Sequence, residues 1–445
     1  MSRRPHVVIL GGGFGGLAAA KRLRRDNVRV TLVDRSNHHL FQPLLYQVAT
    51  AALSAPDIAA PLRKLLHRNK NTHVLLGEAL AIEPDARRVV LDHGVLEYDY
   101  LLLATGMVNN YFGHDAWEEH APGLKTLREA LDIRSRVLRA YEAAERETDE
   151  AKRRALLTFV IIGGGPTGVE MAGALAEIAQ RTLAKDFDTF DPQKDVRVML
   201  VEGGERLLAS MSPESSQHAD RALRNLGVDV RFGSYVSDVD ADGVQIGEKR
   251  IDAATVIWAA GLKASPLTAS LGAELDRAGR VKVEPNLSVP GRPEVFVIGD
   301  LIHLEQDGEL LPGVAQTALQ AGSFAADQIR ADLNGYVKKE RFRYWDKGSM
   351  ATIGRAEAVA EVGQSRFRGF LAWVMWLGIH IAFLIDFRNR VAVMMEWAYA
   401  YLTWRRSARV ILDAPRRRRP ASERSRILAS ALNPVPSSDP EDESE

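Results

Sequence analysis

The chain has 445 residues, about three domain lengths, of which 46% are hydrophobic and 26% charged. This composition is typical of a globular protein and excludes a disordered chain, a coiled coil and a multi-span membrane protein. Lys plus Arg and Asp plus Glu both number 58, so no bulk attraction to nucleic acid is expected, and cysteine is absent. The lack of cysteine excludes disulfides, thiolate metal sites, iron–sulfur clusters and dithiol relays, so redox chemistry here needs an organic cofactor.

The first residues carry no pattern for export. Residues 1–5 lead directly into His6–Leu10, only five residues before a cluster of glycines begins. This segment is too short for the apolar region of a signal peptide, and no cleavage-site pattern follows it. We therefore expect the protein to remain in the cytoplasm unless a later segment attaches it to a membrane.

A dinucleotide-binding turn follows immediately. Val7–Leu10 is typical of a buried parallel strand, and the residues after the glycines are typical of a helix. Gly11 allows a tight bend, Gly13 lets the backbone approach a pyrophosphate, and Gly16 lets helix and strand pack closely. The helix N-terminus offers free N–H groups and partial positive charge to the phosphates. We expect the whole turn to contact the cofactor: Gly11, Gly12, Gly13, Phe14, Gly15 and Gly16.

Two further strands complete this first pattern. The strand Arg29–Asp34 ends in an acid 18 residues after Gly16, where a carboxylate can accept hydrogen bonds from ribose hydroxyls. A later strand over 100–103 ends in small residues, where a larger side chain would obstruct a bound cofactor; these are Ala104, Thr105 and Gly106. A lone glycine pattern is weak, but strand, glycines, helix, strand and acid in this order indicate a dinucleotide fold.

The same pattern recurs in the middle of the chain. An apolar run over 156–162 leads into a second glycine turn and a helix from Val169 to about Gln180, and a strand over 196–201 ends at Glu202. A polar insertion over 185–194 explains the long gap before this acid. An acid here favours the free 2′-hydroxyl of NADH over the phosphate of NADPH, although Arg206 lies nearby. The turn residues expected to bind are Gly163, Gly164, Gly165, Thr167 and Gly168.

Two more strands end in the same manner. The strand over 255–258 is followed by Ala260 and Gly261, and the strand over 294–298 by Gly299 and Asp300. Asp300 is placed to bind the ribityl or phosphate end of FAD, with a helix near Gln316 following it. Each ending alone fits any strand of an α/β domain, but five in order favour two dinucleotide folds. The predicted class is α/β, with an FAD domain split by an inserted NADH domain.

Four blocks of sequence make the prediction narrower. They are residues 37–49, which include Phe41; residues 163–170, which end at Glu170; Ala315-Gln316 with Gln320 and Gly322; and residues 346–348. With these blocks the chain resembles the type II NADH dehydrogenases, non-electrogenic NADH:quinone oxidoreductases of the two-dinucleotide flavoprotein family, from about His6 to Ile411. The lack of cysteine argues against disulfide reductases and sulfide:quinone oxidoreductases, which both use cysteines.

The resemblance implies an activity, its cofactor and its partners. Hydride passes from NADH to the flavin of FAD, and two electrons then pass to a membrane quinone without proton pumping. The resemblance also implies the domains: FAD domain 1–115 and 267–335, helical connector 116–155, NADH domain 156–266, membrane-associating region 336–412 and disordered tail 413–445. Further cofactor contacts are expected at Arg35, His38, His39, Phe41, Ala79 and Ala315. Neither histidine has a partner at metal-ligand spacing, so no metal site is expected.

The residues expected at the reaction centre each have a plainer alternative. Glu170, in the first turn of the second helix, either complements the helix dipole or lies near the contact of flavin and nicotinamide, as in the resembled family. Gln316 and Gln320 share a helix face. They form an exposed polar face, satisfy buried carbonyls or, by resemblance, contact the flavin and the quinone. Whether Glu170 transfers protons or only shapes the site stays open.

Two apolar runs near the C-terminus suggest a membrane anchor. Residues 369–385 contain no Lys, Arg, Asp or Glu, and a second run covers 391–404. Tryptophans within the runs and arginines around them favour an interfacial helix pair on anionic lipid at the cytoplasmic face of the cell membrane. A buried hairpin and a single span are the alternatives. His380 is either an ordinary satisfied histidine or a quinone contact. The residues concerned are Trp373, Trp376, Trp397 and Trp404, with Arg388, Arg390, Arg405, Arg406, Arg409 and Arg416–Arg419.

Other functions stay open at this stage. One is a soluble NAD(P)H flavoprotein that reduces a protein such as a ferredoxin, and another is a non-catalytic redox sensor or scaffold that retains FAD. Homodimerisation is a further expectation. The polar end of the chain, from about residue 415, is expected to be disordered.

Overall fold

The computed structural model describes residues 4–184, 186–337, 340–403, 406 and 408–411. Contacts divide the chain into Met1–Arg409 and Val410–Glu445. Everything below concerns the first unit, and the predicted disordered tail lies outside the described residues. The predicted domain boundaries within the chain stay predictions.

The first fold is a six-stranded sheet in the order β20-β21-β9-β1-β2-β5. All pairs are parallel except that of β20 with β21. Every residue of β1 is buried, as expected of a strand covered on both faces. The strands are β1 (His6–Leu10), β2 (Arg29–Asp34), β5 (Thr72–Leu76), β9 (Tyr100–Leu103), β20 (Ser288–Val289) and β21 (Arg292–Val297).

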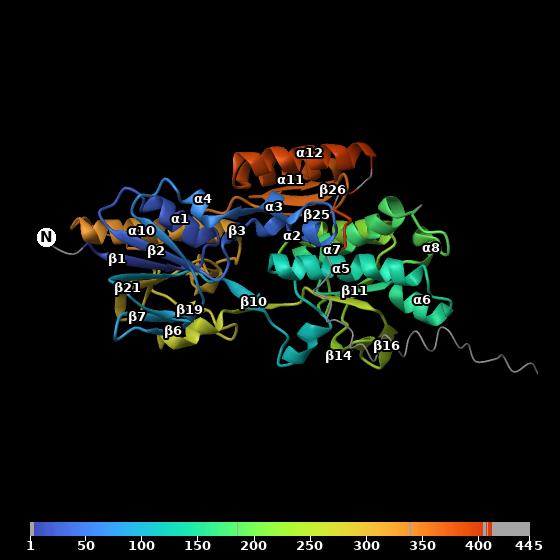
Figure 1. Cartoon of the computed structure of the whole chain (residues 1–445), viewed down its shortest axis with the longest axis horizontal. Coiled ribbons are helices and arrows are strands. Elements are labelled where there is room, and N and C mark those ends of the chain that lie inside the picture. The colour runs from blue at the N-terminus through green and yellow to red at the C-terminus, as the bar shows by residue number, and fades with distance from the viewer. Residues whose placement is uncertain (1–3, 185, 338–339, 404–405, 407, 412–445) are drawn as a thin grey trace, which may run out of the picture. The chain divides into compact units, whose positions relative to one another are not determined.

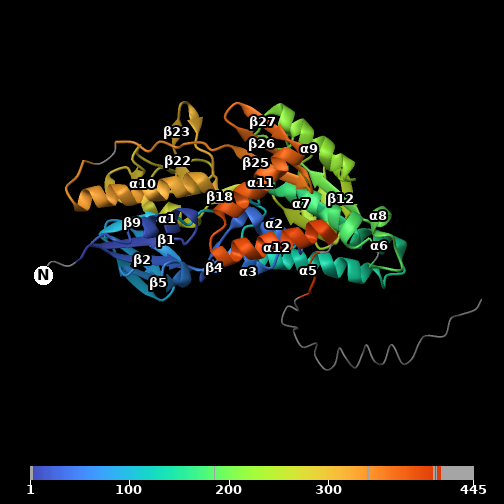
Figure 2. The same ribbon diagram turned by 90° about the horizontal axis from the view of Figure 1, so that it is seen from above.

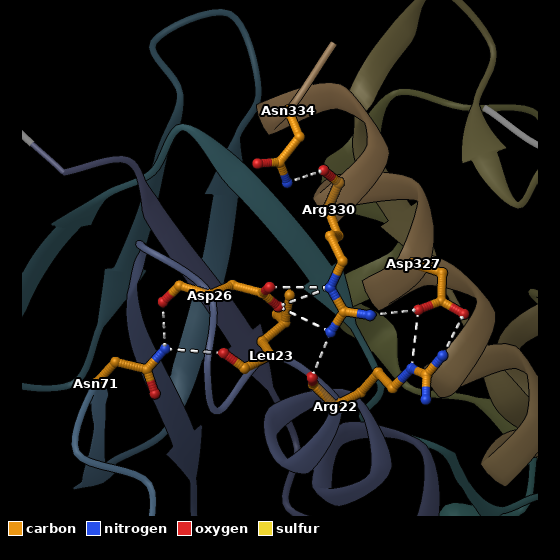
Figure 3. Close-up of polar contacts among 7 residues, drawn as sticks. All are labelled: Arg22, Leu23, Asp26, Asn71, Asp327, Arg330 and Asn334. Carbon is orange, nitrogen blue, oxygen red and sulfur yellow. Dashed lines mark hydrogen bonds and ion pairs between the residues drawn. The ribbon is translucent and has the colours of Figure 1, made fainter. Parts of the chain in front are cut away.

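Helices α1 (Phe14–Arg22) and α10 (Ala315–Leu333) pack closely against each other beside this sheet. A Cβ atom on Gly322 would lie 2.2 Å from the carbonyl oxygen of Gly15, so only glycine fits there. Figure 3 shows the polar network at the far ends of the two helices, where Arg330 pairs with Asp26 (2.9 Å) and Arg22 pairs with Asp327 (2.8 Å). The network joins the C-terminal end of α1 to that of α10.

The second fold is a four-stranded parallel sheet in the order β13-β12-β11-β17. The predicted helix after the second glycine turn is α7 (Pro166–Glu177), continued by one π-helical turn over Ile178–Thr182. The polar insertion separates it from β12, as expected. The other elements are β11 (Thr158–Ile162), β12 (Arg197–Val201), β13 (Asp229–Arg231), β17 (Thr255–Trp258), α5 (Leu127–Ala144), α6 (Glu150–Leu156), α8 (Pro192–Asp195) and α9 (Pro213–Asn225).

Small elements surround the two folds. The two connections between them pair as a short antiparallel ribbon of β10 (Met107–Asn109) and β18 (Leu262–Ala264). The antiparallel sheets are β6 (Ala79–Glu83), β7 (Arg88–Leu91) and β8 (Gly94–Glu97); β14 (Val236–Asp240), β15 (Gly243–Ile246) and β16 (Lys249–Asp252); β3 (His38–Leu40) with β4 (Ala59–Pro61); and β23 (Glu305–Gln306) with β24 (Glu309–Leu310). The remaining elements are α2 (Leu45–Ala49), α3 (Ala55–Ile58), α4 (Leu62–Leu65), β19 (Val281–Lys282) and β22 (Ile302–His303).

The C-terminal region begins with a sheet that the sequence analysis did not anticipate. Strands β25 (Ser349–Gly354), β26 (Glu357–Val362) and β27 (Ser365–Arg368) form an antiparallel meander, followed by α11 (Gly369–Phe383) and α12 (Phe387–Thr403). The two helices lie side by side (Figure 1, Figure 2). Strand β25 packs on α7 so tightly that a Cβ atom on Gly173 would lie 1.6 Å from the Ile353 carbonyl oxygen.

The helices α11 and α12 have one buried and one exposed face. Two tryptophans expected at a lipid surface are instead buried, Trp376 at 1% exposure and Trp397 at 6%, and they share one core with the second fold. Arg406, expected to bind lipid, pairs inside the protein with Glu177 (3.3 Å), and Arg409 pairs with Asp186. The expected surface role is wrong for Trp376, Trp397 and Arg406, because their side chains are buried in contacts with the second fold. Trp404, Arg405 and Arg416–Arg419 lie outside the described residues.

Candidate active site

The first glycine turn is fixed by the acid at the end of β2. One carboxylate oxygen of Asp34 accepts a hydrogen bond from the N–H of Gly12 (2.5 Å), and the other accepts from the N–H of Ser36 (2.6 Å). Burial raises the pKa of Asp34, and these hydrogen bonds oppose that rise. A Cβ atom on Gly13 would meet nothing within 4 Å, so the turn faces open space at the start of α1. Such a helix start, with free N–H groups beside open space, suits a phosphate.

The other predicted residues of the first fold converge on this turn. Gly11 lies against the backbone of Ala104 and Thr105, since a Cβ atom there would lie 2.3 Å from the Ala104 carbonyl oxygen. Gly15 and Gly299 both lie against Ala318 in the first turn of α10, which begins at Ala315. The carboxyl ends of β1, β9 and β21 thus meet the starts of α1 and α10 at one place.

Three buried polar atoms at this place have no hydrogen-bond partner among the described residues. They are Nε2 of His39, Oγ1 of Thr105 and Oε1 of Gln316. The other ring nitrogen of His39 bonds to the Gly12 carbonyl (3.0 Å), and burial lowers the pKa of His39 to about 4, so the ring is neutral. Buried polar atoms normally have partners, so the three atoms indicate a polar ligand.

Asp300 faces a lysine that the sequence analysis missed. Burial raises the pKa of Asp300, while the positive charge of Lys125 opposes the rise. Burial lowers the pKa of Lys125, and the charges of Asp300 and Glu129 oppose that change. The backbone of Lys125 is fixed by Glu129, which accepts from its N–H (2.9 Å) and closes a capping box with Thr126 at the start of α5. The spacing Thr126-x-x-Glu129 was visible in the sequence, but the approach to Asp300 depends on the fold.

The second glycine turn repeats the geometry of the first. Glu202 accepts from the N–H of Gly164 (2.5 Å) with one oxygen and from the N–H of Gly204 (2.6 Å) with the other. Gly163 lies against Ala259 and Ala260, and the space beyond Gly165 is open. Arg206 points elsewhere: it donates to the carbonyls of Ala209 and Met211 and to Ser216. The guanidinium of Arg206, which made the expected preference for NADH over NADPH less certain, is therefore already hydrogen-bonded within the protein.

Glu170 lies deeper, on α7, beside a cavity between the second fold and the C-terminal helices. Burial raises the pKa of Glu170 well above its ordinary value, and the backbone N–H of Thr352 opposes the rise. Trp376 also borders the cavity, and its indole N–H has no partner among the described residues. The cavity is lined by residues of α2, α7, β25, α11 and α12, including Tyr46, Gln47, Glu177, Trp397 and Tyr401, and by Arg355 and Arg406, which follow β25 and α12.

The two glutamines of α10 attach the C-terminal region to the first fold. Gln320 pairs with the backbone of Trp345, donating to its carbonyl (2.9 Å) and accepting from its N–H (3.0 Å). Gln316 donates to the Gly348 carbonyl (3.3 Å), while its oxygen has no partner, as noted above. Both amide atoms of Gln320 therefore satisfy backbone groups, which is the structural alternative considered from the sequence. The side-chain oxygen of Gln316 remains for a ligand.

A row of aromatic rings joins the first glycine turn to α11. Phe14 packs edge-on against Phe41 (5.9 Å between centroids), Phe41 against His380 (6.2 Å), and His380 stacks on Trp376 (4.1 Å). Burial lowers the pKa of His380 to about 4, and its Nδ1 bonds to the Trp376 carbonyl (2.7 Å). His380 is therefore neutral near pH 7, with Nδ1 as the donor and Nε2 as an acceptor.

The comparisons with known proteins agree with this geometry. A model of the pyridine nucleotide-disulphide oxidoreductase family matches residues 5–322, and a model of the NDH2 C-terminal domain matches residues 346–406. The type II NADH:quinone oxidoreductase Ndh of Mycobacterium tuberculosis is 44% identical, over 92% of this chain and 91% of its own. The chain belongs to this family. A second type II enzyme of that organism, NdhA, is 46% identical over 90% of this chain and 87% of its own.

A solved structure of the type II fold extends the comparison. The structure of NDH2 from Plasmodium falciparum in complex with NADH has a TM-score of 0.84, with 20% identity, and covers 92% of this chain and all of that one. At this identity the likeness shows the fold alone. Membership of the type II NADH:quinone oxidoreductases decides against the soluble reductase and the redox sensor considered from the sequence.

The remaining residues predicted to bind are spread around the two turns of this type II enzyme. Arg35 is exposed, His38 is half-buried beside Asn37 (3.1 Å), and Ala79 begins β6. Thr167 lies in the first turn of α7. The sequence analysis did not place Tyr46 and Gln47 at the cavity, although both stand in the block 37–49. Gln47 accepts a hydrogen bond from the indole N–H of Trp397 on α12 (2.7 Å), a contact between segments 350 residues apart.

Proposed function

We propose that this enzyme binds FAD in the first fold, takes hydride from NADH on the second, and passes two electrons to a membrane quinone without pumping protons. The proposal rests on one arrangement that occurs twice in the chain. In each case a glycine turn lies beside open space, and the N–H of its second glycine donates a hydrogen bond to an acidic side chain. The first unit has Asp34 and Gly12, and the second has Glu202 and Gly164. Two such units imply two dinucleotides in one chain.

FAD fits the residues of the first fold. The unpartnered atoms of His39, Thr105 and Gln316 need polar partners, and the open space at Gly13 suits a pyrophosphate. Asp300 has a raised pKa in an enclosed place where it can bind a hydroxyl of the ribityl chain. When bound, FAD supplies the hydride acceptor and the two-electron donor. The residues that would hold it are those of the first turn with Asp34, Arg35, His38, His39, Phe41, Ala79, Ala104, Thr105, Gly106, Gly299, Asp300, Ala315 and Gln316.

NADH is the expected donor on the second fold. Both oxygens of Glu202 accept backbone N–H groups, and each retains a lone pair for a ribose hydroxyl. The 2′-phosphate of NADPH would face the carboxylate of Glu202 at that position. Arg206 cannot offset this, because its guanidinium is hydrogen-bonded to backbone carbonyls. We therefore expect NADH to be used in preference to NADPH. The residues proposed to bind it are Gly163, Gly164, Gly165, Thr167, Gly168, Glu202, Ala260 and Gly261.

The quinone contacts we propose are Gln316, Gln320 and His380, with Glu170 as an acid in the adjoining cavity. Support comes from the unpartnered oxygen of Gln316 and from the neutral ring of His380, whose Nε2 accepts rather than donates. Burial raises the pKa of Glu170 well above its ordinary value, which favours the protonated carboxyl. A protonated carboxyl can donate a proton, and reduction of a quinone consumes two.

A lipid surface is the proposed location of α11 and α12, on the cytoplasmic face of the cell membrane. Within the described residues no helix has the length and apolar character needed to cross a membrane. The support is an exposed apolar face, and such a face is typical of helices that lie in the membrane interface. It includes Phe370, Leu371, Val374, Phe383, Phe387, Val391, Met394, Met395 and Leu402. A homodimer stays a prediction, which sedimentation in detergent would test.

Anaerobic titration in lipid vesicles tests the proposal. NADH should bleach the bound flavin at a ratio of one to one, NADPH should do so far more slowly, and a long-chain quinone should restore the absorbance. The absence of bleaching would refute the proposed hydride transfer. Recovery with a ferredoxin but with no quinone would refute the proposed acceptor. Failure of the protein to sediment with vesicles would refute the lipid contact.

A further inference from the structure

Two aromatic side chains are exposed at the same edge of the second fold. Phe112 is 63% exposed and Tyr235 is 75% exposed. Each ring covers a glycine that follows a parallel strand, Gly261 after β17 and Gly203 after β12. Because β12, β11 and β17 run parallel, these glycines and the binding turn after β11 lie at one carboxyl edge. A ring that stays exposed adds little to the stability of the fold. Two such rings at a dinucleotide-binding edge therefore call for an explanation.

Phe112 is held in place by its backbone and by one ring contact, with Trp258 (6.3 Å between centroids). Its φ of 53° lies in the left-handed region, which is unfavourable for a residue with a side chain. The N–H of Phe112 donates to the side chain of Asn110 (3.0 Å), whose own N–H donates to the Gly261 carbonyl (3.2 Å). A Cβ atom on Gly261 would lie 2.6 Å from Cζ of Phe112. A strained backbone that presents an exposed ring is typical of a ligand contact.

Tyr235 is held beside the acid that we expect to bind ribose. The N–H of Ser234 donates to the carbonyl of Glu202 (3.2 Å), and the N–H of Gly233 donates to the carbonyl of Gly204 (3.0 Å). These bonds fix the turn that carries Tyr235. A Cβ atom on Gly203 would lie 2.8 Å from Cε1 of the Tyr235 ring. The ring therefore lies next to Glu202.

The order of the strands places the two rings on opposite sides of the glycine turn. The sheet order β13-β12-β11-β17 puts Tyr235 on the β12 side and Phe112 on the β17 side, with Gly165 and its open space between. A dinucleotide with its pyrophosphate at this turn and a ribose at Glu202 has its adenine on the β12 side. Its nicotinamide then lies on the β17 side.

We propose that Tyr235 stacks on the adenine of NADH and that Phe112 contacts its nicotinamide ring, so that the two rings bind opposite ends of the substrate. This inference rests on the proposed NADH site of the second fold. Flat aromatic contacts suit both ends, because a base presents a π-face whatever its hydrogen-bonding groups. The two contacts are separable by experiment, since ADP-ribose contains the adenine end but no nicotinamide.

The test compares ADP-ribose with NADH in the flavin-loaded enzyme. With Tyr235→Ala, the inhibition constant of ADP-ribose and the KM for NADH should both rise about tenfold. Tyr235→Phe should retain most of the binding, because stacking needs only the ring. With Phe112→Ala, the KM for NADH should rise or the rate of flavin reduction should fall by a similar factor, while the inhibition constant of ADP-ribose stays unchanged.

The control is Tyr336→Ala, which removes an aromatic ring of comparable exposure (67%) just after α10 and should change neither constant. The proposal is overturned if Tyr235→Ala leaves ADP-ribose unaffected, or if Phe112→Ala leaves NADH kinetics unchanged or tightens NADH binding. It is also overturned if Phe112→Ala weakens ADP-ribose as much as NADH. A wild-type enzyme that neither binds ADP-ribose nor is reduced by NADH would instead refute the proposed function. Bound flavin and circular dichroism verify that each variant is folded.

Discussion

The carboxylate of Glu202 accepts a 2.5 Å hydrogen bond from the backbone N–H of Gly164. Asp34 and Gly12 form the same contact in the first fold, also at 2.5 Å. Each acid therefore does two things at once. It fixes the backbone of the glycine turn that we propose receives a pyrophosphate, and it keeps lone pairs for the proposed ribose. Loss of such an acid should affect both the shape of the turn and the choice of nucleotide.

Replacement of Glu202 tests this double role. Glu202→Gln should raise the KM for NADH about tenfold, since hydrogen bonds to a charged group contribute about 1.5–3 kcal/mol. Glu202→Arg should weaken NADH use far more than NADPH use, because the carboxylate that repels the 2′-phosphate is replaced by a cation. Steady-state kcat/KM with both nucleotides gives the ratio. Glu205→Gln, an exposed neighbour, is the control. Equal losses for NADH and NADPH would contradict the role given to Glu202.

The two turns and their acids could be predicted because they are local. Strand, glycines, helix and acid follow one another in the chain, and their periodicity and spacing specify the fold. The surroundings of Glu170 could not be predicted in this way. They depend on Thr352 of β25 and on Trp376 of α11, about 180 and 200 residues away. The tryptophans were misplaced for the same reason, because composition alone does not show which face of an apolar helix meets Gln47 and which meets solvent.

Glu170 should make stability depend on pH in a particular direction. Burial raises its folded-state pKa, so above about pH 4.5, its ordinary value, the unfolded chain loses a proton that the folded protein retains. The folded state then binds more protons, and the stability contribution of this group falls as pH rises from there through the folded pKa. Glu170→Gln removes the effect.

The measurement for Glu170 is thermal unfolding of wild type and Glu170→Gln as a function of pH. The variant should gain stability relative to wild type as pH rises above about 4.5, and the difference should be smallest in acid. Subtraction cancels the contributions of other buried acids such as Asp300. In the same variant, flavin reduction by NADH should continue while reoxidation by quinone slows. A difference that is constant with pH would show that folding does not change the pKa of Glu170 and would contradict its raised value.

Two glycines, one on α7 and one on α11, should respond oppositely to alanine. A Cβ atom on Gly173 would lie 1.6 Å from the carbonyl oxygen of Ile353, so Gly173→Ala must separate α7 from β25. We expect a loss of about 1–3 kcal/mol or more, seen as a lower Tm. Gly378, in α11, has nothing within 4 Å of a built Cβ atom, and Gly378→Ala should stabilise by about 0.5–1 kcal/mol. A similar Tm for both variants would contradict this packing.

Arg406 joins the end of the C-terminal region to the second fold through a buried ion pair. Its guanidinium lies 3.3 Å from Glu177 and donates to the carbonyls of Thr50 (2.7 Å) and Ala174 (3.3 Å). Burial lowers the pKa of Arg406 and raises that of Glu177, and the positive charge of Arg406 opposes the rise at Glu177. Removal of one partner leaves a buried charge without compensation, which typically costs about 3–5 kcal/mol.

Arg406→Met should therefore lower the Tm by several degrees, and a second substitution, Glu177→Leu, should recover much of the loss because no uncompensated carboxylate remains. The single variant should recover part of its stability at low pH, where Glu177 is protonated. The temperature of flavin release reports the transition. A double variant less stable than Arg406→Met would show that the contacts of Arg406 to the two backbone carbonyls, rather than its pairing with Glu177, stabilise this end of the chain.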